Sequence, residues 1–347
     1  MEHTTSAEKK SGSRAILLPE DPENLLDFQS MFQSEIACLR YLEQVRWPGG
    51  FACEKCSWIG DPFRVSVRPR VLTCRSCRHE ASVTAGTVMH RSKTPILVWF
   101  WAAYLIATQT PGISALEVQK KLGITRYETA FQLMHKLRSA MVRPNRDKIG
   151  AEWPLEMDLI YIGGQHKSGL QGMTDNTPVI IAVEIKRREM RDANSGKVIK
   201  RGLAGRVRIE MLSSKSPVSI DKFANSCIAP NAIIFTDGGG EFRNLSSFGF
   251  NHKPSTMLRD RAKMDVCLPI VSTVTANLKA WINGTFHGIR KQHLQAYLNE
   301  FTFRFNRRFY RSISFRTLLG LGTHRAGQTY AELYNSSRKR QKTETKS

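Results

Sequence analysis

Two Cys-x-x-Cys pairs constrain the fold of this chain more than any other feature of its sequence. The pairs are Cys53 with Cys56 and Cys74 with Cys77, and 17 residues separate them. Each pair can form a tight turn that presents two sulfurs to one ion, and four thiolates fill the tetrahedral shell of Zn²⁺. We therefore expect a small β module around a structural zinc. Free thiols are the alternative, but so small a module gains little stability without the metal.

The charge of the chain favours a polyanionic partner. Lys and Arg number 52 against 30 Asp and Glu, so the formal net charge is +22. Neutralisation of phosphates by such side chains drives binding to nucleic acids. A basic surface that serves only solubility is the alternative interpretation.

No membrane partner is expected. The first 14 residues are polar and do not resemble a secretory signal. The longest apolar run, 96–107, is 12 residues long, whereas a membrane-spanning helix needs about 20. Cysteines arranged in metal-binding pairs also favour a reducing compartment, so we expect a cytoplasmic, nucleoid-associated protein.

Two aspartates lie in or next to apolar, β-branched runs that are typical of buried strands. Asp158 falls within the run 155–163, and Asp237 follows the run 231–236. A buried carboxylate is costly unless it is paired, hydrogen-bonded or bound to a metal. On neighbouring strands of a basic protein, the two indicate a divalent-cation site facing a polyanion. The alternatives are a satisfied buried acid at Asp158 and a turn-forming one at Asp237.

The order of the predicted elements indicates the fold class. Strands are expected at about 155–163, 177–186, 205–212 and 231–236, and helices follow at about 270–282 and 291–311. This is the order of an α/β, RNase H-like mixed sheet flanked by helices. Such domains hold two Mg²⁺ ions about 4 Å apart that activate the attacking oxygen and stabilise the leaving oxygen.

A helix-turn-helix module is predicted before the sheet. Ser114 to Glu117 and Thr125 to Glu128 both have the spacing of a capping box, and Gly123 between them suits a tight turn. Arg126, Lys136 and Arg138 on the second helix are candidates to reach DNA. A pair of helices that serves only packing is the alternative.

Taken together, these motifs resemble the zinc-ribbon DDE transposases of bacterial insertion sequences over roughly residues 25 to 325. The resemblance rests on the cysteine pairs and on further segments: Thr84 to Thr87, Asp158 with Tyr161 to Gly164, Thr236 to Gly238, Asn277 to Thr285 and His293 to Arg308. It implies Mg²⁺- or Mn²⁺-dependent cleavage and strand transfer on double-stranded DNA, at the element ends and at the target. It also implies a homo-oligomer assembled on that DNA.

The resemblance further implies a third metal ligand on a helix after the sheet. Many relatives carry a glutamate there, whereas the matching helix of this chain offers no acid, and Asn277 with Lys279 resembles an Asp-Asp-Asn variant. An amide oxygen can ligate Mg²⁺ but adds no charge, and Lys279 would contact a phosphate. Glu300 is the alternative ligand and Asp265 a weaker one. Leu159 replaces an acid common beside the first aspartate, so a decayed copy that only binds DNA is the alternative function. A nuclease or recombinase that cleaves without strand joining is a third.

Two basic segments are further candidates for DNA contacts. Four arginines follow at helical spacing and are expected to share one helix face: Arg304, Arg307, Arg308 and Arg311. Residues 186–201 are expected to form a basic hairpin between the second and third strands. A solvated surface is the alternative interpretation of both.

The expected organisation has five parts. They are a disordered tail (1–22), a helix with the zinc ribbon (23–92), the helix-turn-helix (93–147), the RNase H-like transposase domain (150–328) and a basic tail (329–347).

Overall fold

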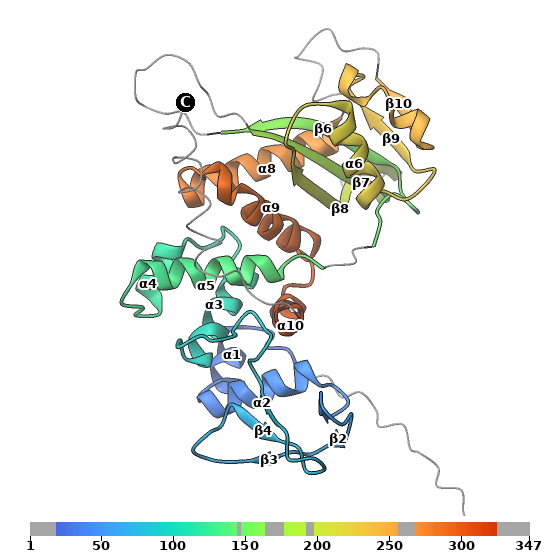
Figure 1. The fold of residues 1–347 in the computed structure, drawn as a ribbon. Helices are drawn as coiled ribbons and strands as arrows, with labels where there is room; N and C mark the ends of the chain where they lie inside the picture. The colour runs from blue at the N-terminus through green and yellow to red at the C-terminus, as the bar shows by residue number, and fades with distance from the viewer. Residues whose placement is uncertain (1–18, 144–146, 164–176, 192–197, 256–267, 325–347) are drawn as a thin grey trace, which may run out of the picture.

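The computed structural model describes residues 19–143, 147–163, 177–191, 198–255 and 268–324 (Figure 1). Most of the two predicted tails, and Asp265, lie outside these ranges. Within them, no helix is both long and apolar enough to cross a bilayer.

The N-terminal half begins with two helices where the sequence predicted one. They are α1 (Leu25–Met31) and α2 (Glu35–Arg46). The break arises because the side chain of Ser34 accepts a hydrogen bond from the Ala37 N–H at 3.2 Å and so caps a new helix.

A small β module follows, as the cysteine pairs predicted. One antiparallel pair joins β1 (Phe51–Ala52) to β2 (Ile59–Gly60). A three-stranded antiparallel sheet contains β3 (Phe63–Arg64), β4 (Val71–Thr73) and β5 (Glu80–Ser82).

Three helices come next, and the last helix that the structure describes packs against the first and third of them and against α2. They are α3 (Ile96–Thr108), α4 (Ala115–Lys121) and α5 (Tyr127–Ala140), and the last helix is α10 (Arg311–Thr323). Phe315, Leu318 and Leu319 of α10 are buried in the hydrophobic cluster of the N-terminal half. The predicted boundary grouped 311–323 with the sheet, whereas in the structure these residues complete the core of the first half.

The second half is built on one five-stranded mixed sheet, in the order β10-β9-β6-β7-β8. Its strands are β6 (Leu155–Ile162), β7 (Thr177–Arg191), β8 (Val198–Met211), β9 (Ile233–Thr236) and β10 (Asn251–Pro254). β6 is antiparallel to β7, and β7 to β8, while β6 and β10 each run parallel to β9. The predicted hairpin, 186–201, corresponds to the paired ends of β7 and β8, and its turn at 192–197 lies outside the described residues. The sequence analysis missed β10, because this strand is short and polar.

Helices cover both faces of this sheet (Figure 1). One face carries α6 (Pro217–Cys227), and the other carries α8 (Pro269–Phe286) and α9 (Lys291–Asn306). Side chains of a strand alternate between faces, so Met157 packs with the α6 cluster while Ile160 packs with the α8 cluster.

The arrangement of the four C-terminal arginines differs from the prediction. α9 ends at Asn306, and Arg311 is the first residue of α10. Arg304 and Arg311 therefore lie on two different helices, and the four side chains do not share one helix face.

Candidate functional site

The four cysteines of the ribbon converge on one point. The sulfurs of Cys53, Cys56, Cys74 and Cys77 lie within 4.8 Å of one another. Two of the separations, Cys53 to Cys77 and Cys56 to Cys74, are 3.6 and 3.7 Å. A tetrahedron with Zn–S bonds of about 2.3 Å requires sulfur separations of about 3.8 Å. The thiolate set fits Zn²⁺ and fills its shell, as a structural site requires.

The backbone of both cysteine pairs has the same turn. The residue after each second cysteine, Ser57 or Arg78, has a positive φ of 57° or 60°. Each of these residues donates its N–H to the carbonyl of the first cysteine of its pair, at 2.9 and 3.1 Å. The two turns therefore present their sulfurs in the same way to a shared centre.

Asp158 and Asp237 are brought to the same level of the large sheet. β6 pairs with β9 in parallel, with Leu155 opposite Ile234 and Glu156 opposite Phe235. Continuing this register places Asp158 beside Asp237, on strands that are about 4.8 Å apart. Asp158 is two residues from Glu156 on β6, and Asp237 is two residues from Phe235, which lies opposite Glu156. By strand alternation, both positions fall on the face covered by α8.

The backbone fixes each of these carboxylates. Oδ1 of Asp158 accepts from the N–H of Leu159 at 2.8 Å, and Oδ1 of Asp237 accepts from the N–H of Gly239 at 2.9 Å. Gly238, with φ of 78°, makes the turn that follows β9. Burial raises the pKa of Asp158 above its usual value, and the nearby charge of Asp237 raises it further.

A third carboxylate and two lysines surround the pair. A Cβ added to Gly239 would lie 2.7 Å from Oε2 of Glu241 and 3.2 Å from Oδ1 of Asp237, so both carboxylates close over this glycine. Lys215 pairs with Glu241 at 3.3 Å. The ammonium of Lys279 is near enough to lower the pKa of Asp158, opposing the effect of burial. Three carboxylates thus lie close to two lysine ammonium groups, and this arrangement suits the binding of a divalent metal ion and a phosphate.

Glu156, which was not predicted from the sequence, fixes the helix α8, which faces Asp158 and Asp237. Its buried Oε2 accepts from the N–H groups of Ile270 and Val271, at 2.8 and 2.7 Å. These are orphan donors of the first turn of α8. The carboxylate therefore holds the start of α8 against β6, two residues from Asp158. In the sequence, the signal for Glu156 was its spacing of two residues from Asp158, which on a strand puts both side chains on the same face.

Asn277, the predicted third ligand, is an exposed residue of α8. Val274 and Leu278 form part of the buried stripe of α8. Asn277 and Lys279 flank this stripe on opposite sides, because residues two apart on a helix point in nearly opposite directions. Asn277 lies at a cavity lined also by Gln109 and Trp281, on the side away from Lys279.

Glu300, the alternative ligand, lies elsewhere. It is fully buried and pairs through Oε2 with Nε of Arg138 at 2.7 Å. Arg138 is itself 0% exposed, so the prediction that this residue reaches DNA is wrong. The helices α5 and α9 use both side chains to join the two halves of the chain.

The predicted helix pair is present as α4 and α5. Ser114 caps α4 by accepting from the Glu117 N–H at 3.1 Å, and Gly123, with φ of 62°, lies in the turn. The second capping box is absent, because the N-cap of α5 is Arg126, which makes no side-chain cap bond. The Arg126 side chain is exposed.

The C-terminal arginines contact the protein itself. Arg304 donates to the carbonyls of Gln109 and Thr110, and Arg311 donates to the Thr110 hydroxyl. Arg308 donates to the carbonyl of Ala204 on the sheet edge. Arg307 donates to the carbonyl of Phe303 at 3.2 Å and lies over its ring.

Comparison with known families now identifies the class of protein. Residues 152–306 match the family model of the ISXO2-like transposase domain, which makes the second half of the chain a DDE transposase domain. Residues 33–80 match the transposase zinc-ribbon domain. The chain belongs to the zinc-ribbon DDE transposases. No curated protein and no solved structure matches it.

Proposed function

We propose that this protein is a DNA transposase that binds the terminal inverted repeats of its element and catalyses Mg²⁺-dependent cleavage and strand transfer. The observation that supports the proposal is the parallel register of β6 and β9, in which Glu156 lies opposite Phe235. Two residues further along each chain segment, Asp158 and Asp237 are proposed to lie side by side on one face of the sheet. Two carboxylates at one strand spacing can share divalent ions, and hard oxygen ligands suit Mg²⁺ or Mn²⁺.

The sheet supports an RNase H-like assignment. Numbered in chain order, its strands lie as 5-4-1-2-3, with the second strand antiparallel to its neighbours and the first parallel to the fourth. The first aspartate lies on the first strand and the second follows the fourth, as the sequence predicted.

The residues of the chain take separate parts in the proposed reaction. Asp158 and Asp237 would hold the metal ions, which when bound activate the attacking oxygen and stabilise the leaving oxygen. Lys279 stands on the same side and can bind a phosphate next to the scissile bond. The third ligand stays unassigned, because Asn277 remains a prediction to which the described geometry adds no support.

The N-terminal modules would recognise the DNA. The zinc ribbon and the α4–α5 pair, with exposed Arg126, are the proposed readers of the terminal repeats. Assembly of two or more protomers on paired ends in the bacterial cytoplasm completes the proposal.

The test compares wild type with Asp158→Asn on terminal-repeat DNA, with and without Mg²⁺. We expect metal-dependent nicking and strand joining by wild type and a loss of at least about 100-fold in the variant, since it loses a charged metal ligand. Glu23→Gln is the matched control, because Glu23 is exposed just before α1, outside the zinc ribbon and the α4–α5 pair. Equal cleavage by wild type and Asp158→Asn would refute the assignment to this site.

A non-catalytic DNA-binding protein is the second candidate function. The observation that favours it is that α8 contains no acidic residue. DNA binding by wild type, with no cleavage in either Mg²⁺ or Mn²⁺, would establish this alternative. Cleavage without strand joining would instead indicate a nuclease.

A further inference from the structure

An arginine-rich cavity lies at the outer edge of the large sheet, away from the aspartate pair. Its volume is about 240 Å³, and it lies between the segment after α5, the edge strand β8 and the end of α9. Four arginines line it: Arg143, Arg206, Arg208 and Arg307. Of these four, only Arg307 was predicted from the sequence to contact DNA.

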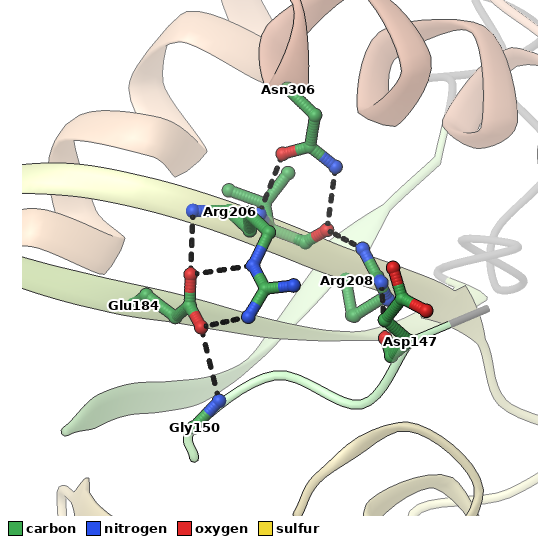
Figure 2. A network of polar contacts seen from close by, with 7 residues as sticks. Asp147, Gly150, Glu184, Arg206, Arg208 and Asn306 are labelled. Atoms are coloured by element: carbon green, nitrogen blue, oxygen red, sulfur yellow. Dashed lines mark hydrogen bonds and ion pairs between the residues drawn. The ribbon is translucent and has the colours of Figure 1, made fainter. Parts of the chain in front are cut away.

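One of the four arginines is anchored by a buried acid. Arg206 makes two side-chain bonds to the Glu184 carboxylate, from Nε at 2.9 Å and from Nη2 at 2.8 Å (Figure 2). Glu184 also accepts from the N–H of Gly150 at 3.1 Å, and its side chain is 0% exposed. This network fixes the position of the guanidinium without removing it from the cavity wall.

The second arginine is held by backbone carbonyls. Arg208 is 7% exposed and donates to the carbonyls of Val207 and Asp147, at 3.1 and 2.6 Å. Asn306 fixes the same part of the edge strand, because its side chain accepts from the Val207 N–H and donates to the Val207 carbonyl (Figure 2). These hydrogen bonds therefore hold the wall of the cavity in one arrangement.

The remaining two arginines bring charge to this wall. Burial, together with the nearby guanidinium groups of Arg143 and Arg208, lowers the pKa of Arg307 to about 10. Arg307 remains a cation at neutral pH, so the repulsion between these groups persists in the folded protein. Arg143 is exposed at the rim.

We propose that this cavity binds a phosphate of the DNA backbone, at a position other than the scissile one. Guanidinium groups match phosphate oxygens with paired, charge-assisted hydrogen bonds. Among the described residues, the four arginines stand against three carboxylates: Asp147 in the lining, Glu184 behind Arg206, and Glu152, whose charge also acts on Arg206. An anion therefore offsets a local excess of positive charge.

In the proposed transposase, the cavity would be an additional contact with the DNA backbone. This part of the inference rests on the proposed function. The register relates Met157 to Ala182 and Ala182 to Arg208, so Arg208 lies two strands from β6. Arg208 alternates along β8 with Val207 and Ile209, which pack in the α8 cluster, so it lies on the sheet face opposite that of Asp158. A phosphate at the cavity is thus separate from the acidic site, and it would position the duplex instead of reacting.

The first experiment uses inorganic phosphate as the probe. Phosphate should raise the melting temperature of the wild-type protein more than sodium chloride does at equal ionic strength. The extra rise should vanish in Arg143→Gln/Arg307→Gln and diminish in Arg143→Gln, whose exposed position carries little risk to folding. Arg40→Gln is the matched control, since Arg40 is exposed on α2, and it should behave as wild type.

The second experiment measures duplex DNA binding across salt concentrations without Mg²⁺, so that its result does not depend on cleavage chemistry. The double variant should bind more weakly, and the slope of log K against log salt should shrink by about 1, the value for one lost phosphate contact. Arg40→Gln reports the effect of losing one positive charge elsewhere on the surface.

The outcomes separate the two proposals. A reduced slope in the double variant supports the cavity even if the wild-type protein never cleaves DNA, in which case only the catalytic proposal fails. A phosphate-dependent rise with an unchanged DNA slope would show a site for free anions and overturn the DNA contact. Neither effect in the double variant would overturn the site altogether.

Discussion

At the scale of single residues, the buried pair of Arg138 and Glu300 has the largest expected effect on stability. Both side chains are 0% exposed, and 162 positions separate them in the sequence. Tyr297 stacks on the guanidinium of Arg138 at 4.1 Å. Glu300 also pairs with Nη1 of Arg304 at 3.5 Å. The charge of Arg138 is tolerated in the interior because the Glu300 carboxylate lies against it.

We predict that Glu300→Gln lowers the free energy of unfolding by about 3–5 kcal/mol, because it leaves Arg138 buried without its counter-charge. Urea denaturation would measure the change. The double variant Arg138→Met/Glu300→Leu should recover most of the loss, since apolar side chains of similar volume need no counter-charge. A single variant within 1 kcal/mol of wild type would contradict this account.

A second residue-scale prediction concerns His135. Burial lowers its pKa to about 2, and the charge of Arg138 contributes. The unfolded chain protonates this histidine near pH 6.5, so below that pH the unfolded state binds more protons. The free energy of unfolding should therefore fall as the pH falls, by up to about 1.4 kcal/mol per pH unit for this group.

Denaturant melts between pH 7 and pH 5 would test this prediction. His135→Phe should flatten the decline, because its neighbours Phe131 and Tyr297 are aromatic. His324→Gln, an exposed control, should leave the decline in place. Parallel pH profiles for wild type and His135→Phe would argue against a neutral buried histidine.

The residue scale also shows what a sequence can and cannot reveal. Asp158 was recognised because the apolar run around it is local in the sequence, and the same holds for Asp237. Arg138 appeared to be a DNA ligand, because nothing near it in the chain indicates a partner 162 positions away. Asn277 was matched by motif, but its direction from the helix depends on which residues of α8 face the sheet.

At the scale of elements, the ribbon depends on its metal. Its strands are two or three residues long, and so short a sheet has few hydrogen bonds of its own. Removal of zinc by a chelator, or Cys74→Ser, should unfold residues 51–82 while the large sheet persists. Hydrogen exchange would show this as lost protection at Leu72 with protection kept at Ile181. Cys227→Ser is the control, because Cys227 is a buried cysteine at the end of α6, outside the ribbon. Full protection of Leu72 after zinc removal would refute a structural role.

The end of α9 shows why helix boundaries escaped the sequence. No glycine or proline interrupts residues 291–316, so the local pattern favours one long helix. In the structure, side chains from the end of α9 satisfy the free edge of β8: Asn306 bonds Val207, and Arg308 bonds the Ala204 carbonyl. These tertiary bonds protect an exposed strand edge, and α9 ends where they are made.

At the scale of the whole molecule, the last helix closes the core of the first half. Phe315 of α10 is 0% exposed and lies within 6.0 Å, between ring centroids, of five aromatic side chains from α1, α2, α3 and the α1–α2 connection. These partners are Phe28, Phe32, Tyr41, Phe100 and Tyr104. This contact could not be predicted from the sequence, because a hydrophobic face does not specify which distant surface covers it. The N-terminal half therefore cannot complete its core until residues 311–323 have been synthesised.

Phe315→Ala should consequently destabilise the N-terminal half, by about 3–5 kcal/mol as expected for a buried phenylalanine that leaves a cavity. Hydrogen exchange should quicken in α2 and α3 at the far end of the sequence, and less in β6, which packs in other clusters. Phe309→Ala removes the same atoms from a side chain that is 76% exposed, and it should change stability by no more than about 0.5 kcal/mol. If exchange instead quickened only within α10, the two ends of the chain would not share one core, and the order of folding inferred from it would be wrong.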